Sequence, residues 1–233
     1  GITVDTNKLS ISEKERLTRR YTSAILPIIG PEKDIPAPDV GTNAQVMDWV
    51  MDTYSMNKGF TIQGVVTGKD IEVGGSVGRK EATGRGIMII TMQLLEKLQI
   101  DVKDTTIAIQ GMGNVGGTAA RLLKEQGAKI IAVSDVSGGV RNKNGLDIDG
   151  ICNYLDEGRN LLEDCPLKKG DTRISNQELL ATQCDILIPA ALENQITVEN
   201  VERVKAKIIV EGANGPISDQ ADAVLEKKGI TVI

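Results

Sequence analysis

The sequence predicts an α/β protein whose core is a doubly wound parallel sheet. From residue 59 onward, strand-like and helix-like segments alternate, as expected for a parallel sheet with helices on both faces. The apolar runs 186–188 and 208–210 are typical of strands that are buried on both faces. A glycine-rich turn at 111–116 follows one predicted strand and opens a helix. Together these observations favour strands that are joined by crossover helices.

The first part of the chain differs in character from the rest. We therefore expect two domains, 1–58 and 59–233, with the sheet in the second. Ser12 followed by Glu15 forms a capping box, which predicts a helix over 13–29 that ends before the next glycine and proline.

A proline-containing segment then separates two predicted helices. Residues 35–39 are not expected in a helix, because each residue before a proline is pushed to extended geometry. Thr42 is predicted to cap a second helix over 43–55. We expect the apolar face of this helix, with Trp49 and Val50, to be exposed or to pack against a neighbouring chain.

The second domain is predicted to alternate helices and strands throughout. The predicted helices cover 83–98, the segment from the glycine turn to 126, 147–157, 177–182, 198–204 and 218–228. The predicted strands cover 105–110, 129–134, 185–189, 207–210 and 231–233. Gly127 is a natural residue to end a helix. Ser137-Gly138-Gly139 and Asn144-Gly145 both predict turns, and Asn144-Gly145 is the stronger hairpin signal of the two.

Composition excludes several classes of function. The chain has 233 residues and a net charge of -5, without a basic stripe or interleaved aromatic residues, so no nucleic-acid partner is expected. It contains no histidine, which excludes His-based acid–base chemistry and Ser-His-Asp triads. Cys152, Cys165 and Cys184 are odd in number and lack metal-type spacing, so we expect no metal site and no disulfide framework.

The sequence also bears on the compartment. No stretch approaches the ~20 apolar residues that span a bilayer, and no signal peptide precedes the fold, so we expect no membrane partner and a cytoplasmic location. The chain opens in a strand-like segment at 2–4 and closes in another at 230–233. We expect both ends to interrupt folded structure.

The glycine turn carries the strongest functional signal. Gly111 allows a tight strand-to-helix turn, Gly113 lets a pyrophosphate approach the backbone, and Gly116 lets the helix pack close to the strand. The positive end of the helix then faces the phosphates. With Asp135 at the end of the next strand, this context predicts a Rossmann-type dinucleotide site. The alternative is a plain glycine turn.

Asp135 bears on the choice of dinucleotide. A carboxylate at this position is expected to accept hydrogen bonds from the adenosine ribose hydroxyls and to repel a 2′-phosphate, which favours NAD over NADP. Arg141 and Lys143 lie downstream and soften this discrimination, so NADP stays possible. The alternative is a solvated turn residue.

Three further segments offer candidate site residues. In the glycine-rich segment 74–86, Arg79 supplies a cation and Thr83 a hydroxyl near a helix start, although a flexible loop would have the same composition. Asp39 follows rigid proline geometry and is a candidate for proton transfer, or else a simple turn residue. Asn214 directly follows a buried strand and could hydrogen-bond a carboxamide or a ribose, or belong to an ordinary turn.

Taken together, these segments resemble the glutamate dehydrogenase family. The matching segments are Pro-Ala-Pro-Asp-Val-Gly-Thr at 36–42, Gly-Gly-Ser-x-Gly-Arg-x-x-Ala-Thr-Gly-Arg-Gly at 74–86, Gly-x-Gly-Asn-Val-Gly at 111–116 and Glu-Gly-Ala-Asn-Gly-Pro at 211–216. They cover nearly the whole chain in the family's order, and the segment at 74–86 is the most discriminating.

The resemblance implies an enzyme that deaminates L-glutamate oxidatively to 2-oxoglutarate and ammonia, with NAD or NADP as the hydride acceptor. It implies that Asp39 is a catalytic residue that shuttles protons. The cofactor-binding residues that it implies are Arg79, Thr83, Gly111, Gly113, Asn114, Val115, Gly116, Asp135 and Asn214. It also implies that residues 1–58 are the remnant of a second α/β domain for substrate and oligomer contacts, in a protein that assembles as a homo-hexamer.

The sequence departs from the family in what it lacks. The family's catalytic lysine and substrate-binding lysines lie upstream of residue 1, and its carboxy-terminal helices lie downstream of residue 233. We therefore expect this chain alone to bind NAD weakly and not to catalyse. The alternatives are a leucine- or phenylalanine-type dehydrogenase, which the segment at 74–86 disfavours, and a non-catalytic NAD-binding module, which Asp39 disfavours.

Overall fold

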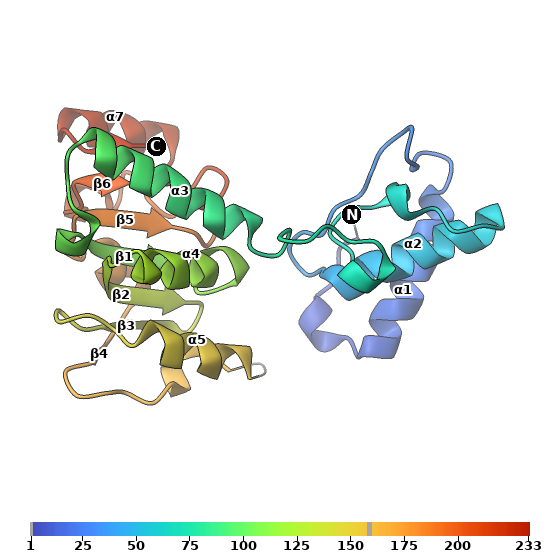
Figure 1. Cartoon of the computed structure of the whole chain (residues 1–233), viewed down its shortest axis with the longest axis horizontal. Helices are drawn as coiled ribbons and strands as arrows, with labels where there is room; N and C mark the ends of the chain where they lie inside the picture. The colour runs from blue at the N-terminus through green and yellow to red at the C-terminus, as the bar shows by residue number, and fades with distance from the viewer. Residues whose placement is uncertain (1, 158–159) are drawn as a thin grey trace. The chain divides into compact units, whose positions relative to one another are not determined.

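The computed structural model describes residues 2–157 and 160–233. The chain folds into two compact units, Gly1–Lys80 and Glu81–Ile233 (Figure 1). Each unit has its own hydrophobic core. The two units divide between Lys80 and Glu81, which is later in the chain than the domain boundary that we predict between residues 58 and 59. That boundary stays a prediction.

The first unit is built around two helices. Its elements are η1 (Thr6–Lys8), α1 (Ile11–Ile25), α2 (Ala44–Lys58), η2 (Gln63–Val65) and η3 (Ile71–Val73), where η marks a short 3₁₀ turn. The buried face of α2 packs against Val65 and Val66, which are 0% and 2% exposed. Val50 is buried in this cluster and Trp49 is half-buried against it. Our expectation that this face stays exposed was therefore wrong, because the segment after α2 folds back over it.

Helix α1 begins earlier than we predict. Its capping box is Ser10 with Glu13: the Glu13 N–H donates to the Ser10 hydroxyl over 3.3 Å, and the Ser10 N–H donates to the Glu13 carboxylate over 2.9 Å. The prediction of Ser12 as the cap was wrong. The helix also ends at Ile25 rather than 29, because Pro27 has no N–H to continue the helical hydrogen bonds.

Helix α2 is capped by Asn43, not by Thr42 as predicted. The Asn43 side chain accepts a hydrogen bond from the Val46 N–H over 3.1 Å. The Thr42 hydroxyl is engaged elsewhere, since it accepts from the Asp39 N–H over 2.6 Å and donates to the Asp39 carbonyl over 2.8 Å. Gly59, with a φ of 81°, ends the helix in the left-handed conformation.

The second unit contains the predicted doubly wound sheet. Its helices are α3 (Ala82–Lys97), α4 (Asn114–Glu125), α5 (Ile148–Asp156), α6 (Asn176–Leu180) and α7 (Asp219–Lys227), with η4 (Val102–Asp104), η5 (Leu162–Asp164) and η6 (Val201–Arg203). Its strands are β1 (Thr106–Gln110), β2 (Lys129–Asp135), β3 (Gly138–Arg141), β4 (Thr172–Ile174), β5 (Ile186–Pro189), β6 (Ile208–Ile209) and β7 (Thr231–Val232). They are ordered β4-β3-β2-β1-β5-β6-β7. Strands β2, β1, β5, β6 and β7 run parallel, whereas β3 and β4 extend one edge in antiparallel pairing.

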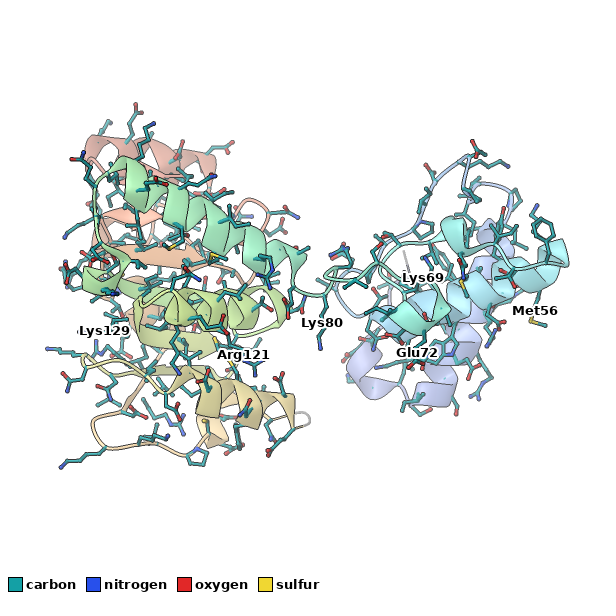
Figure 2. The ribbon with its side chains drawn as sticks, in the orientation of Figure 1. Met56, Lys69, Glu72, Lys80, Arg121 and Lys129 are labelled. Atoms are coloured by element: carbon teal, nitrogen blue, oxygen red, sulfur yellow. The ribbon has the colours of Figure 1, made fainter. Side chains whose placement is uncertain are left out.

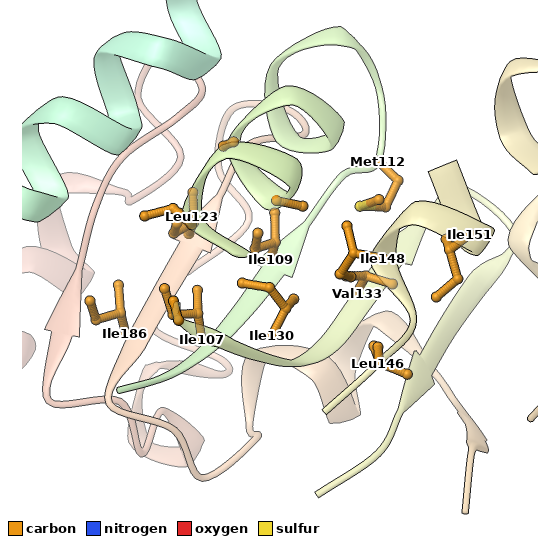
Figure 3. Close-up of a cluster of buried hydrophobic side chains, with 14 of the residues drawn as sticks. Ile107, Ile109, Met112, Leu123, Ile130, Val133, Leu146, Ile148, Ile151 and Ile186 are labelled. Atoms are coloured by element: carbon orange, nitrogen blue, oxygen red, sulfur yellow. The ribbon is translucent and has the colours of Figure 1, made fainter. Parts of the chain in front are cut away.

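Helices cover both faces of this sheet. One buried cluster joins α3, α4 and α5 to one face, with Ile107 and Ile109 of β1 at its centre (Figure 3). The other cluster joins α6, η6 and α7 to the opposite face, where Ala108 of β1 lies. Figure 2 shows Arg121 on α4, and its guanidinium forms an ion pair over 2.7 Å with Asp156 of α5. Successive side chains of β1 therefore point into two different apolar layers, one on each face of the sheet, as the predicted fold requires.

Of the two predicted turns, the hairpin lies at the one around Ser137, so the preference for Asn144-Gly145 as the hairpin was wrong. The antiparallel hairpin joins β2 to β3 through residues 136–137, and Asp135 pairs with Gly138 across it. The Asp135 carboxylate closes this turn by accepting hydrogen bonds from Ser137. Gly145 lies in a separate turn, after which the Leu146 N–H donates to the Ile130 carbonyl and the chain continues into α5.

Two other predicted elements differ from the structure. The predicted helix over 198–204 shrinks to η6, because the Asn200 side chain accepts from the Thr197 N–H and donates to the Gln195 carbonyl, which competes with helical bonding. Residues 2–4 form no strand and are exposed.

Strands β3 and β4 were not predicted, since four and three residues give no clear periodicity. Among the described residues, no helix has the length and apolarity to cross a membrane, and no cluster of side chains is suited to a metal ion.

Candidate functional site

The glycine turn joins the end of β1 to the start of α4. Gly111 has a φ of +91°, a conformation that side chains rarely adopt, and a Cβ there would lie 2.8 Å from the Ala190 carbonyl oxygen. The turn therefore needs glycine for its backbone conformation and for its contact with the residue after β5. This is the tight turn that the sequence predicts at Gly111.

Gly116 and Gly113 have opposite surroundings. A Cβ at Gly116 would lie 1.8 Å from the Gly111 carbonyl oxygen, so α4 packs against the end of β1 as closely as predicted. A Cβ at Gly113 would meet nothing within 4 Å, and this residue is exposed. Gly113 therefore leaves an open approach to the backbone at the start of α4, while its role toward a pyrophosphate stays a prediction.

The start of α4 is suited to an anion. Gly113 is its N-cap residue, and no side-chain cap hydrogen bond closes this end of the helix. Asn114 and Val115 form its first turn, which contains no acidic residue. The helix dipole and the backbone N–H groups at such an end attract negative charge.

Asp135 ends the neighbouring strand β2 and is half-buried. One carboxylate oxygen accepts from the Ser137 N–H over 2.8 Å and from the Ser137 hydroxyl over 2.5 Å. The other accepts from the Leu162 N–H over 2.7 Å. Since a carboxylate offers about four acceptor positions, these contacts fix the orientation of the group and leave capacity for about one more donor.

Thr83 lies in the first turn of α3 and is exposed. The next residue, Gly84, packs directly against α4, because its Cβ would lie 2.6 Å from the Thr118 Cβ and 2.8 Å from the Val115 carbonyl oxygen. This close packing places Thr83 beside the amino-terminal part of α4. The structure therefore brings together Thr83 and the glycine turn, as the sequence predicts.

The loop after β6 carries Asn214, which is exposed. The Gly212 and Ala213 N–H groups both donate to the Pro189 carbonyl at the end of β5, each over 3.0 Å. A Cβ at Gly212 would lie 2.8 Å from the Ala190 Cβ. Because Gly111 also contacts Ala190, the loops after β1, β5 and β6 meet at the carboxyl edge of the sheet, where open α/β folds bind ligands.

Two predicted site residues belong to the first unit. Asp39 is exposed, and its carboxylate accepts from the Val40 N–H over 2.7 Å. Its loop is held by a 3.0 Å hydrogen bond from the Thr67 N–H to the Pro36 carbonyl. Arg79 is exposed and lies in the loop before the second unit. The other predicted site residues all lie in the second unit.

Sequence reasoning missed two residues at the carboxyl edge of the sheet. Gln110, the last residue of β1, is 2% exposed, and its side-chain amide donates to the Gln195 side-chain oxygen over 2.8 Å. Gln195 lies in the loop after β5. The only signal in the sequence was the position of Gln110 directly before the glycine turn.

Comparison with known proteins bears on the whole chain. The family model described as Glutamate/Leucine/Phenylalanine/Valine dehydrogenase matches residues 74–233, and the model described as Glu/Leu/Phe/Val dehydrogenase, dimerisation domain, matches residues 1–56. A glutamate dehydrogenase of Thermotoga maritima is 52% identical over 100% of this chain and 55% of its own length. The NAD-specific glutamate dehydrogenase A of Halobacterium salinarum is 48% identical over 100% of this chain and 52% of its own.

Solved structures agree with these sequence matches. The hetero-hexameric glutamate dehydrogenase of Thermus thermophilus in its Leu-bound form superposes with a TM-score of 0.92 at 36% identity. The match covers 100% of this chain and 54% of that one. The chain thus spans about half the length of the relatives that it matches.

Proposed function

Since the chain belongs to the Glu/Leu/Phe/Val dehydrogenase family, we propose that it carries the nicotinamide-dinucleotide half of a glutamate dehydrogenase. The observation that carries the proposal is the glycine turn at the carboxyl edge of the sheet, with Gly113 open at the start of α4. The intact protein would convert L-glutamate, water and NAD⁺ to 2-oxoglutarate, ammonium, NADH and a proton.

Residues of the second unit would bind the dinucleotide. The N–H groups at the start of α4, at Asn114, Val115 and Gly116, would face the pyrophosphate across Gly113. Thr83 would donate its hydroxyl from the adjacent start of α3. When bound, the nicotinamide accepts the hydride from the amino acid.

The nicotinamide side of the site would lie at the loops after β5 and β6. Asn214 is exposed there and would hydrogen-bond the nicotinamide half of the dinucleotide. Arg79, in the loop before α3, is the one proposed cofactor-binding residue that belongs to the first unit. The binding roles of these residues, like those at the glycine turn, are part of the proposal.

Asp135 supports a preference for NAD over NADP. Its carboxylate is fixed by Ser137 and Leu162 and keeps capacity for about one further donor, which a ribose hydroxyl would supply. A 2′-phosphate at the same place would meet a fixed negative charge. Relatives from Halobacterium salinarum and Bacillus subtilis are named NAD-specific, which agrees with this preference.

Asp39 would move protons during the interconversion of amine and ketone. Loss of ammonia requires water to add to an imine, and a carboxylate that gives and takes protons speeds such steps. The loop that carries Asp39 presents it to solvent in a fixed conformation. The names of the relatives favour glutamate over leucine or phenylalanine as the substrate.

The assembly is also part of the proposal. The match of residues 1–56 to a dimerisation domain supports contacts between copies of the chain. The hetero-hexameric relative supports an assembly of six subunits, and we propose that here the six are copies of one chain. We also retain the cytoplasmic location as a prediction and 1–58 as the oligomer-forming domain.

The proposed function is tested by ligand binding and turnover. Calorimetric titration of this chain should show weak NAD binding, while activity with saturating NAD and L-glutamate should appear only in the full-length protein. Absence of NAD binding to a folded chain would overturn the proposal.

A further inference from the structure

A partly buried hydrogen bond spans the point where the sheet changes winding direction. Strand β1 leads through α4 to β2 on one side, whereas its other neighbour is β5. The helices that follow lie on opposite faces, so the switch point of the doubly wound sheet lies between β1 and β5. Gln110 at the end of β1 and Gln195 in the loop after β5 join across this point.

Gln195 links two loops. The switch loop, residues 190–196, is tied to the Asn214 loop, residues 211–216, by the Gln195 N–H, which donates to the Pro216 carbonyl over 2.8 Å. The neighbouring Asn194 N–H donates to the Gly215 carbonyl, next to Asn214, over 2.9 Å. Whatever fixes Gln195 therefore fixes the backbone that directly follows Asn214.

The orientation of both side-chain amides follows from their partners. The Gln195 nitrogen donates to the Glu193 carbonyl over 3.0 Å, so its oxygen must face Gln110. The Gln110 nitrogen then donates to it, which leaves the Gln110 side-chain oxygen buried with no hydrogen-bond partner among the described residues. This unpaired acceptor makes Gln110 a costly residue for stability.

An apolar side chain would serve packing better at this position. Ile107 and Ile109 on the same strand are fully buried and apolar. Replacing both partners of a buried hydrogen bond by apolar groups is often neutral or stabilising, whereas a single unpaired acceptor is not. Gln110 therefore has a use other than holding the core, and its one described side-chain hydrogen bond leads to Gln195.

We infer that Gln110 is a positioning residue: through Gln195 it holds the switch loop and the Asn214 loop in the geometry that receives the nicotinamide half of the cofactor. This inference rests on the proposed function, because it assumes that the site binds a nicotinamide dinucleotide. The adenosine half, at Asp135 and the start of α4, does not depend on this hydrogen bond.

The test compares two ligands on the whole chain and its Gln110→Met variant. Loss of one hydrogen bond should raise the Kd for NAD by about 3–10-fold, while the Kd for ADP-ribose, which lacks nicotinamide, stays within about twofold of the parent value. The fluorescence change of NADH on binding, which reports on the nicotinamide ring, should shrink in parallel. Methionine removes the buried unpaired acceptor, and the Gln195 oxygen that loses its donor belongs to a half-buried side chain that water can reach, so the unfolding midpoint should not fall.

Controls separate the possible outcomes. Gln220→Met changes an exposed residue of α7 and should leave both Kd values unchanged. Gln195→Met breaks the same bond from the loop side and repeats the test if Gln110→Met does not fold. An unchanged NAD affinity, or equal weakening of NAD and ADP-ribose, would overturn the inference. Failure of the parent chain to bind either ligand would instead overturn the proposed function.

Discussion

The backbone N–H of Leu162 donates a hydrogen bond over 2.7 Å to the Asp135 carboxylate, which joins the start of η5 to the end of β2. The same carboxylate that is proposed to select the cofactor thus also organises the antiparallel edge of the sheet. Two consequences follow for substitutions at this position, one for binding and one for stability.

Asp135→Ser should reduce the preference for NAD. The fixed negative charge disappears, so discrimination against the 2′-phosphate should fall by about 1–3 kcal/mol, which is about 5- to 150-fold in the ratio of the two Kd values. Calorimetric titration with NAD and NADP measures this ratio. If the parent binds both equally and Asp135→Ser changes neither, Asp135 has no part in cofactor choice.

The same substitution should also lower stability, because Leu162 and Ser137 lose their acceptor. Asp135→Asn is the matched control, since it keeps the size and one carbonyl oxygen but removes the charge. It should lose less stability than Asp135→Ser in urea unfolding and still relax the NAD preference. Equal unfolding midpoints for all three proteins would contradict the structural role.

Gly116→Ala should destabilise the second unit. A Cβ there would lie 1.8 Å from the Gly111 carbonyl oxygen, so α4 must move away from β1, and such overpacking costs about 1–3 kcal/mol or more. Gly86→Ala is the matched control in α3, because a Cβ there meets nothing within 4 Å. This substitution should raise the free energy of unfolding by about 0.5–1 kcal/mol, since alanine favours a helix more than glycine does. Urea unfolding measures both; a Gly116→Ala protein as stable as the parent would show that the contact is not tight.

Asp39→Asn should impair turnover in the full-length protein without affecting cofactor binding. An amide cannot exchange protons, so kcat should fall by about 10²–10⁴-fold while the Kd for NAD stays the same. Glu32→Gln changes another exposed carboxylate of the first unit and should leave kcat unchanged. Turnover near the parent value in Asp39→Asn would remove Asp39 from the mechanism.

Asp185 should make stability depend on pH. Burial raises the pKa of its carboxyl, but hydrogen bonds from Lys207 and Thr106 outweigh burial and leave the pKa below its ordinary value. Because the pKa of Asp185 is lowered in the folded state, its carboxylate stabilises the folded protein at pH values above about 3.9, the pKa of an aspartate in the unfolded chain. This stabilisation is lost as the pH falls through the pKa that Asp185 has in the folded state.

Asp185→Asn should therefore cost about 1–3 kcal/mol of unfolding free energy at pH 7 and progressively less below about pH 4. Urea unfolding of parent and variant across this pH range measures the difference. Thr106→Val is the companion variant, because it removes only the hydroxyl that donates to Asp185 over 2.6 Å. A difference between parent and Asp185→Asn that does not change with pH would contradict the assignment.

Local chemistry explains which parts of the fold the sequence predicted. The glycine turn was predictable, because the backbone angle of Gly111 and the close packing of Gly116 are set within a few residues. The start of α1 was not, because Ser10 with Glu13 and Ser12 with Glu15 have the same capping spacing. Spacing alone cannot choose between two overlapping boxes.

Long-range contacts set the limit for the site. The bond between Gln110 and Gln195 joins residues 85 positions apart, and no local pattern marks either one. The Asp135 carboxylate was predicted as a ribose acceptor, but its contact with Leu162 depends on how the chain returns after α5. Motifs in the sequence were thus enough to predict candidate site residues, whereas the residues that hold them in place could be identified only in the folded structure.

The placement of β1 between β2 and β5 also has a consequence for synthesis on the ribosome. Strand β2 is made soon after β1 and pairs with one of its edges, but the other edge of β1 stays unpaired until β5 is made. The roughly 75 residues between β1 and β5 take about 4–15 s to translate at about 5–20 residues per second. During that interval the nascent chain exposes an apolar strand edge, which is a template for unwanted pairing with other chains. Slowing translation between β1 and β5 should therefore increase aggregation of the newborn protein, and a holdase that covers β1 should suppress it.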